Sequence, residues 1–239
     1  MKKYILWPDT HVPYEDKKAV NLALRVADAF EPDGIVLKGD FQDAYPISDF
    51  PKKKRARIED EIYAGRKLLD RIEAIGAKTH DFEEGNHEAR LPTYIAKNCP
   101  ELSGIIPSLA TLLGLHPKWT WHPYRSVMRL GKLHLSHDFG ASGPTAHIKA
   151  MNDVWGNAAH GHTHHFGIQY KGSLSGKSHF GAALGCLADK NQVEYMNRAK
   201  CAHWVQGLGL GYLLPNGNFH LTLCPFVNGV AIVEGKVVR

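Results

Sequence analysis

The sequence predicts an α/β fold in which two β-sheets pack face to face with helices outside them. In the first hundred residues, short apolar runs alternate with segments whose apolar residues recur at helical spacing, as in parallel strands joined by helices. The second half has short apolar runs separated by turn-forming residues, as in antiparallel hairpins. The length of 239 residues, with 44% hydrophobic and 22% charged residues, is ordinary for one globular domain.

The first half begins with a βαβ unit, in which two short apolar runs flank a segment of helical periodicity. Two of the following segments end at a glycine, and two more helices are limited by proline or glycine. The expected elements are strands at Tyr4–Trp7, Gly34–Leu37 and Lys78–Phe82, and helices at Ala19–Phe30, Arg57–Ile75, Glu88–Lys97 and Leu102–Leu113.

The second half is expected to be mainly antiparallel. Its clearest signal is the run Pro215-Asn216-Gly217-Asn218, which predicts a hairpin between two apolar runs. The expected strands are Trp119–Trp121, Val127–Leu130, Leu133–Ser136, Leu208–Leu214, Phe219–Cys224, Val230–Val233 and Val237–Val238. We therefore expect one domain over residues 1–239, with an α/β front half and an antiparallel back half. Residues 165–239 would form a C-terminal antiparallel portion that caps the site or pairs with another subunit.

Composition excludes several classes of protein. The four cysteines are far apart and form no C-x-x-C pair, which argues against a disulfide framework or a cysteine zinc site and favours the cytoplasm. No apolar run approaches the roughly 18–20 residues that cross a bilayer, so no membrane association is expected. A domain of this size needs no metal to hold its core, so any metal would serve chemistry.

Two glycine-rich patterns are not ligand-binding motifs. The segment Gly172–Ser178 resembles a P-loop, but three residues separate its glycines instead of four, and we predict a flexible loop. The pattern Gly207-x-Gly209-x-Gly211 lies in a predicted strand rather than at a turn into a helix, which argues against dinucleotide binding.

Five short segments place metal-binding side chains directly after predicted strands. They are Asp9-Thr10-His11, Gly39-Asp40-Phe41-Gln42-Asp43, Gly85-Asn86-His87-Glu88, His137-Asp138 and Gly161-His162-Thr163-His164. Ligands of open α/β sheets gather beyond the carboxyl ends of the strands, so these segments should meet in one crevice. Imidazole and carboxylate together suit Mn, Fe, Zn or Ni, and one carboxylate can bridge two cations. The glycines before Asp40, Asn86 and His162 allow sharp turns and close backbone approach.

In this order, the five segments resemble the motifs of the calcineurin-like metallophosphoesterase superfamily, and in particular its broad bacterial and phage-type group. The resemblance spans residues 9–164, about two thirds of the chain. It implies a four-layer α/β/β/α sandwich, with two mixed β-sheets flanked by helices. It also implies two divalent metal ions, with Mn foremost and Fe, Zn or Ni as alternatives.

Carried over position by position, the resemblance assigns a role to each residue of the motifs. It implies that the first metal is held by Asp9, His11, Asp40 and His164, and the second by Asp40, Asn86, His137 and His162. For the fourth segment we prefer His137 to His134, because only His137 falls at the strand end. His87 would lie beside the metals as the general acid, and Asp43 would accept a hydrogen bond from it. Arg90 could reach a phosphate oxygen or lie on a helix surface.

This site predicts a metal-dependent hydrolase. Two cations would neutralise the phosphate oxygens, and a bridging water of lowered pKa would become the hydroxide that attacks phosphorus in line. His87 would then protonate the leaving oxygen.

The substrate is less well defined by sequence. Serine/threonine phosphatases share Gly-Asn-His-Glu but typically have arginine before it and Asp-Arg-Gly after their Gly-Asp, whereas this chain has Glu84 and Asp43-Ala44-Tyr45. Basic residues and two aromatic rings, Tyr45 and Phe50, follow the second strand on the side where the metals should gather. Such a combination binds phosphates on the cations and bases on the rings. The residues expected to bind substrate are Lys52, Lys53, Lys54, Arg55, Arg57 and Tyr45.

We therefore predict a phosphodiesterase or nuclease-type enzyme acting on nucleotides or nucleic acid. The alternatives are a small-molecule phosphomonoesterase and a scaffold that has lost catalysis. Alternatively, the basic run is only a solvated helix start.

Overall fold

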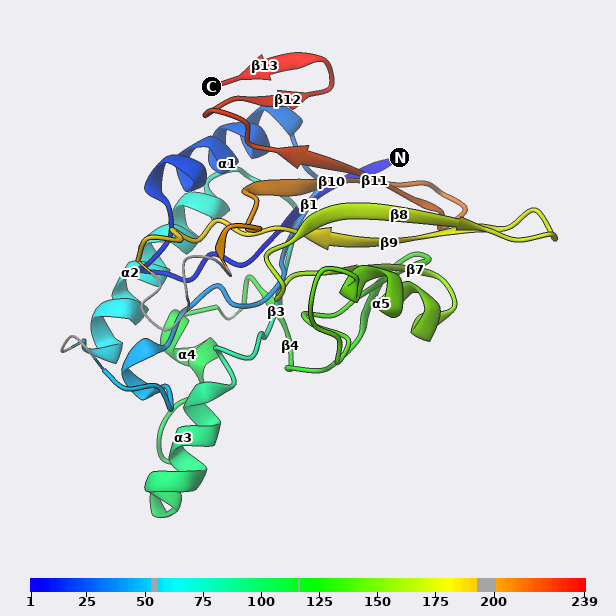
Figure 1. Cartoon of the computed structure of the whole chain (residues 1–239). Helices are drawn as coiled ribbons and strands as arrows, with labels where there is room; N and C mark the ends of the chain where they lie inside the picture. Colours follow the sequence, from blue (N-terminus) through cyan, green and yellow to red (C-terminus); the bar gives the residue numbers. More distant parts are fainter. Residues whose placement is uncertain (53–55, 116, 193–200) are drawn as a thin grey trace.

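The computed structural model in Figure 1 describes residues 1–52, 56–115, 117–192 and 201–239, and it has a mixed α/β fold. Within these residues the helices are α1 (Lys17–Phe30), α2 (Ile58–Glu73), α3 (Arg90–Asn98), α4 (Leu109–Leu113) and α5 (Ala146–Val154). The strands are β1 (Lys2–Trp7), β2 (Gly34–Leu37), β3 (Thr79–Glu83), β4 (Thr120–His122), β5 (Met128–Leu130), β6 (Leu133–Leu135), β7 (Asn157–His160), β8 (Phe166–Gly172), β9 (Ser178–Leu184), β10 (Gly207–Leu213), β11 (Phe219–Pro225), β12 (Ala231–Val233) and β13 (Lys236–Val238).

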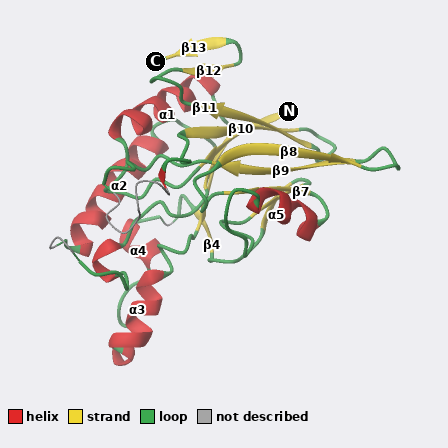
Figure 2. Ribbon diagram, in the orientation of Figure 1, coloured by secondary structure: helices red, strands yellow, loops and turns green. Residues whose placement is uncertain are grey.

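The described strands form two large mixed sheets and a small hairpin (Figure 2). The first sheet has the order β11-β10-β1-β2-β3-β4, in which β1 to β4 run parallel and β10 and β11 are antiparallel additions. The second has the order β5-β6-β7-β9-β8, with a parallel centre and antiparallel edges. The hairpin β12-β13 lies against α1.

The expected division into an α/β front half and an antiparallel back half is wrong. Strand β4 pairs in parallel with β3, and β10 returns from the end of the chain to pair with β1. Residues 165–239 thus supply strands to both sheets. The reason is that β1 lies in the interior of the protein, where its last four residues are buried. Water cannot reach the backbone of such a strand, so a neighbouring strand must pair with it along each edge.

Alternate side chains of β1 enter two different cores. Ile5 and Trp7 pack with α1 and α2, whereas Tyr4 and Leu6 pack between the two sheets. The pattern Gly207-x-Gly209-x-Gly211 lies in β10, as expected for a strand, and its glycines leave room for the packing of the sheets. A Cβ on Gly209 would lie 3.0 Å from Leu184 and 3.1 Å from Leu6.

Most of the expected elements are confirmed within one to three residues at each end, with one clear error. The helix expected at Leu102–Leu113 is only the five-residue α4, because Gly104 takes a left-handed φ of 81° and Pro107 disfavours helix at the residue before it. The P-loop-like segment is the turn of the β8-β9 hairpin. No described helix is long and apolar enough to span a bilayer.

Candidate metal centre

The five ligand segments follow β1, β2 and β3 of the first sheet and β6 and β7 of the second, so they meet where the carboxyl ends of both sheets come together. Backbone hydrogen bonds join the segments to one another. The His11 N–H donates to the Asp40 carbonyl at 2.9 Å, and the Gly161 N–H donates to the His137 carbonyl at 3.1 Å. The site is therefore built on strand ends that are fixed to one another before any side chain is considered.

Four of the expected ligands have left-handed backbone conformations, which residues other than glycine seldom adopt. The φ angles are 56° at His11, 48° at Asp40, 61° at His162 and 57° at His164. Each such residue costs of the order of 1–2 kcal/mol, and such strain concentrates at functional sites. The turns after these strands aim the side chains inward at a cost to stability.

Glycines allow the segments to come close. A Cβ on Gly85 would lie 2.2 Å from Asp40 Oδ1, and a Cβ on Gly161 would lie 2.1 Å from Asp9 Oδ1. Gly39 has a φ of 83° and lies against Gly85. The expectation that these three glycines permit close approach is confirmed.

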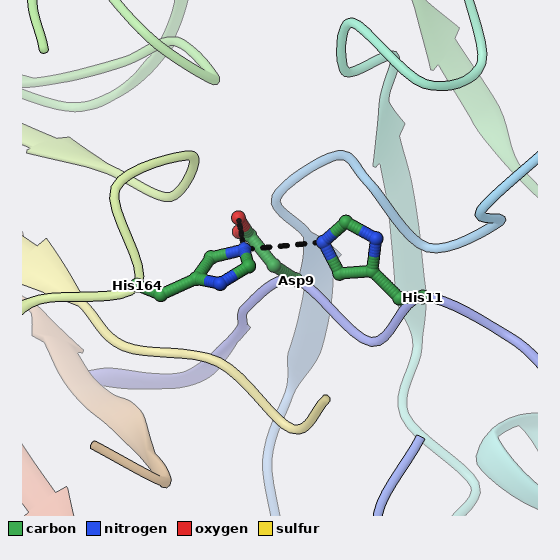
Figure 3. Close-up of side chains that lie close together, drawn as sticks. All are labelled: Asp9, His11 and His164. Atoms are coloured by element: carbon green, nitrogen blue, oxygen red, sulfur yellow. Dashed lines mark hydrogen bonds and ion pairs between the residues drawn. The ribbon is translucent and has the colours of Figure 1, made fainter. Parts of the chain in front are cut away.

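The first group of ligands is Asp9, His11 and His164, shown in Figure 3. The Nε2 atoms of His11 and His164 are 3.1 Å apart, and His164 Nε2 is 3.1 Å from Asp9 Oδ2. All three side chains are buried. Asp9 Oδ1 has no hydrogen-bond partner among the described residues.

The second group is Asp40, His137 and His162, with Asn86 among them, and a further group of His11, Asp40 and His87 overlaps both. Asn86 Oδ1 is 2.8 Å from His162 Nδ1 and 3.2 Å from His137 Nε2. Asp40 Oδ2 lies 3.2 Å from His137 Nε2 and 3.9 Å from His11 Nε2 of the first group. Asp40 is therefore placed between the two groups.

The tautomers of two rings make the site attractive to cations. His11 donates from Nδ1 to the Asp43 carboxylate at 2.9 Å, and His137 donates from Nδ1 to the Lys38 carbonyl at 2.7 Å. In the neutral rings, Nε2 therefore carries a lone pair and acts as an acceptor. These Nε2 atoms face other acceptor atoms across the site. Buried acceptors that face one another need a positive charge between them. These buried histidine and carboxylate clusters could therefore hold a metal ion.

The charges of the site agree with this fit. Burial opposes protonation of His137, but the Asp40 carboxylate outweighs it and raises the pKa of His137 to about 10. Burial likewise opposes ionisation of Asp40, yet the neighbouring imidazoles hold the pKa of its carboxyl well below the usual value. The carboxylates that attract this proton would attract a metal ion that replaces it.

Asp43 and Arg90 both contact His87, and Asp43 accepts a hydrogen bond from it, as expected. The Asp43 carboxylate accepts its closest imidazole hydrogen bond from His11, and it is the Asp43 carbonyl that accepts from His87 Nδ1, at 2.8 Å. The His87 Nδ1 to Asp43 Oδ2 distance is 3.5 Å. Arg90 donates to the same carbonyl at 2.6 Å and to His87 Nε2 at 3.1 Å. Arg90 is thus part of the site rather than an isolated surface residue.

Several residues that support the site had no role assigned from sequence. Both carboxylate oxygens of Glu88 accept backbone N–H groups, from Asp40, Gln42 and Gly85 at 2.8–2.9 Å, which joins two ligand segments. Glu88 lies within a recognised segment, so its position was a usable signal. Trp204 packs edge to face on His164 with ring centroids 4.0 Å apart, and no pattern near it indicated this.

A cavity of about 340 Å³ opens over the two groups. Its lining includes His87, Arg90, Phe50 and Trp204 besides the ligand residues His11, Asp40, Asn86, His162 and His164. This volume suits a small organic ligand. His134, the rejected alternative, instead contacts Arg129 and the Asn157 carbonyl.

Lys52 and Arg57, the described basic residues of the expected substrate-binding run, do not line this cavity. Lys52 donates to the Ser48 hydroxyl and the Phe50 carbonyl, and Arg57 forms an ion pair with Glu59. Lys53, Lys54 and Arg55 lie outside the described residues. The Tyr45 side chain is only 5% exposed and packs against Tyr14, so its role as a stacking surface for a base is contradicted by burial.

Glu61 is a buried carboxyl near the site that the sequence did not single out. It lies in the first turn of α2 and is 2% exposed. Burial, with a smaller contribution from the Asp43 carboxylate, raises its pKa to about 8, although the backbone N–H groups of Ala44 and Tyr45 partly offset this.

Replacing Glu61 with glutamine should stabilise the protein at pH 8 but not at pH 5. Between about pH 4.5 and pH 8 the unfolded chain loses the Glu61 proton while the folded protein keeps it, so wild-type stability falls as pH rises. The raised pKa lowers the free energy of unfolding of the wild type by roughly 4 kcal/mol at pH 8. We expect Glu61→Gln to recover about 2 kcal/mol of this, because the buried amide needs hydrogen-bond partners of its own. Denaturant unfolding at pH 5 and pH 8 measures this difference in stability, and a chelator keeps bound metal from contributing to it. The control is Glu59→Gln on the same turn, whose side chain is 60% exposed. A Glu61→Gln effect that does not change with pH contradicts the assignment.

Comparison with known proteins gives distant relatives. No protein-family model matches the chain. The chain is 23% identical to the Gene 54 protein of Mycobacterium phage L5 over 263 aligned residues, which cover 99% of this chain and 98% of the relative. It is 26% identical to the Gene 54 protein of Mycobacterium phage D29 over 265 aligned residues, with coverage of 99% and 98%. These names state no activity, and their phage origin agrees with the phage-type resemblance of the motifs.

Proposed function

We propose that the chain is a two-metal phosphoesterase that hydrolyses phosphodiester bonds of nucleotides or nucleic acid. The observation that carries this proposal is the convergence of seven buried or half-buried oxygen and nitrogen ligands into two groups, with Asp40 between them. We further propose that the two sheets and their covering helices form the four-layer sandwich of calcineurin-like metallophosphoesterases.

Asp9, His11, Asp40 and His164 would hold one cation, and Asp40, Asn86, His137 and His162 the other, with manganese as the preferred metal. Bound there, the pair would neutralise phosphate oxygens and acidify a water nucleophile. Asp43 and the Lys38 carbonyl fix the rings of His11 and His137, so each presents Nε2 to its cation.

His87 would protonate the leaving alcohol. Its Nδ1 is held by the Asp43 carbonyl, which leaves Nε2 as the atom that can give a proton to the substrate. Arg90 now donates to this same Nε2, so it must turn away before Nε2 can carry a proton. A phosphate oxygen of the substrate would provide the alternative partner for its guanidinium.

The cavity favours a diester over a monoester. Among its described lining residues, Arg90 is the one side chain with a permanent positive charge, and it is shared with Asp43 and His87. A diester carries a single negative charge on its phosphate, whereas a monoester dianion needs more neutralisation.

Hydrolysis of paired chromogenic esters tests this proposal. Manganese-loaded protein should cleave bis(p-nitrophenyl) phosphate faster than p-nitrophenyl phosphate, and chelator should abolish both activities. Faster cleavage of the monoester would favour the small-molecule phosphatase alternative. Bound metal without cleavage of either ester would favour a scaffold.

His87→Asn provides a second test of the mechanism. The variant should keep its metal content, because in the proposed set His87 holds no cation, and should lose about 10²–10⁴-fold in kcat because the general acid is gone. Metal analysis beside steady-state kinetics measures both quantities. Unchanged turnover would remove the proposed role, and lost metal would make His87 a ligand.

A further inference from the structure

Two aromatic side chains line the cavity over the ligand groups and have no part in the proposed chemistry. Phe50 is 45% exposed and Trp204 is half-buried, and both line the same cavity as His87 and Arg90. An exposed phenylalanine beside a polar, metal-binding cavity offers a flat apolar surface to whatever binds there.

The two rings belong to different ends of the site. A row of ring contacts begins with Trp204 on His164, continues from His164 to His11 with centroids 5.0 Å apart, and reaches His87 with centroids 4.5 Å from His11. Trp204 thus lies at the end of the site that contains the first ligand group.

Phe50 lies in the loop that approaches the His87 end of this row. The preceding residue, Asp49, forms an ion pair with Lys97 of α3 at 2.9 Å, and Arg90 at the start of the same helix contacts His87. The Phe50 carbonyl also accepts a hydrogen bond from Lys52 at 2.6 Å. The loop is therefore tied to the helix that borders the site.

The size and charge of the cavity limit what these rings can bind. Its volume of about 340 Å³ suits a single nucleotide-sized group better than a long strand. A track for a polymer needs a row of cations for successive phosphates, whereas the described lining carries only Arg90 besides its histidines.

We propose that Phe50 and Trp204 are specificity-determining residues that stack on a nucleobase, so that the site selects nucleoside phosphoesters of one or two nucleotides. This inference rests on the proposed phosphoesterase function, because the metal pair would bind the phosphate that the base accompanies. Base stacking on an aromatic side chain contributes enough to be measured by removal of one ring.

Competition experiments separate base recognition from phosphate recognition. Manganese-loaded protein hydrolyses bis(p-nitrophenyl) phosphate as the reporter, and thymidine 5′-monophosphate and methyl phosphate are compared as inhibitors. Both inhibitors present the same phosphate to the metals, so the ratio of their inhibition constants reports the nucleoside alone. We expect the nucleotide to bind at least about tenfold more tightly to the wild type.

The variant Phe50→Ala should bring this ratio toward one, whereas Phe50→Tyr should keep it. Trp204→Ala removes the ring at the other end of the site, so it is compared with the wild type using thymidylyl-thymidine as inhibitor and should lose the added affinity of the second base. Trp155→Ala is the control, since Trp155 is 87% exposed and does not line the cavity. Metal content is measured for every variant, and if Trp204→Ala loses metal through its contact with His164, Phe50→Ala decides.

The outcomes distinguish the two proposals. A reporter that is never hydrolysed sinks the proposed function itself. Hydrolysis with a ratio near one in the wild type, or with a ratio that Phe50→Ala leaves unchanged, overturns the stacking role alone. Decathymidylate is also compared with the mononucleotide at equal molar concentrations of the two inhibitors. Inhibition by decathymidylate that is more than tenfold stronger overturns the inferred size of the substrate.

Discussion

The variant Asp40→Asn is expected to lose both cations and at least about 10³-fold in kcat. Asp40 Oδ2 lies close to His137 of one ligand group and to His11 of the other, so this single carboxylate would serve both of the proposed cations. An amide of nearly the same shape removes the negative charge and puts a nitrogen in place of one of the two carboxylate oxygens. Two cations contribute several kcal/mol to the transition state, and each 1.36 kcal/mol is tenfold in rate. Plasma mass spectrometry of dialysed protein gives the metal content, and ester hydrolysis gives kcat.

The matched control is Asp81→Asn. Asp81 is a carboxylate of β3 in the same sheet, but it pairs with His122 at 2.8 Å rather than with any expected ligand. This variant should keep both metals and its activity within about twofold, since partly exposed pairs of this kind contribute little. Equal losses in the two variants would indicate general damage to the sheet, and a fully active Asp40→Asn would refute the shared ligand.

The variant Gly85→Ala should unfold more easily and bind metal poorly. Its new Cβ would lie 2.2 Å from Asp40 Oδ1 and 2.3 Å from the Asp40 backbone nitrogen. The second contact is with backbone, so a side-chain rotation cannot relieve it and the turn after β2 must move. Overpacking of this kind costs about 2–3 kcal/mol, which corresponds to a fall in Tm of roughly 4–12 °C. Thermal unfolding in chelator isolates this structural cost from the loss of bound metal.

Gly167→Ala is the control for that comparison. Gly167 lies in β8 without a left-handed φ, and a methyl group added there would meet no described atom within 4 Å. A strand residue with a side chain is no less stable than glycine, so Tm should stay the same or rise slightly. If Gly85→Ala behaves like Gly167→Ala, the close approach of the two segments is not required for the fold or for metal binding.

The ligand segments could be predicted from sequence because each directly follows a strand. The apolar run of β1 ends at Trp7, two residues before Asp9, and that of β2 ends at Leu37, shortly before Asp40. The carboxyl ends of parallel strands lie along one edge of a sheet, so residues distant in sequence could be assigned to one site without knowledge of the strand order. The left-handed turns at the ligands were signalled only by the glycines beside them.

The strand order itself could not be predicted, because it depends on contacts between distant segments. Nothing local to β10 indicates that it pairs with β1 rather than with a neighbour in sequence. Strand β7 is a four-residue run with two alanines, and strand β8 has a polar outer half, so neither has a strong periodic signal. The same limit applies to Trp204, which reaches His164 only through the fold.

The contacts of individual side chains also could not be predicted from the sequence. The prediction that Asp43 accepts a hydrogen bond from His87 is confirmed, but the sequence did not indicate that the acceptor is the carbonyl or that the Asp43 carboxylate holds His11. For Tyr45 the prediction was wrong. Its place in the loop after β2 suggested an exposed ring, whereas the packing against Tyr14 buries it.

Two divalent cations are proposed to bind on either side of the Asp40 carboxylate. Anomalous scattering from crystals grown with manganese tests this proposal most directly. Two anomalous peaks per chain are predicted, one among Asp9, His11 and His164 and the other among Asn86, His137 and His162. Absence of any peak at these side chains, or manganese bound only elsewhere on the chain, would contradict the account.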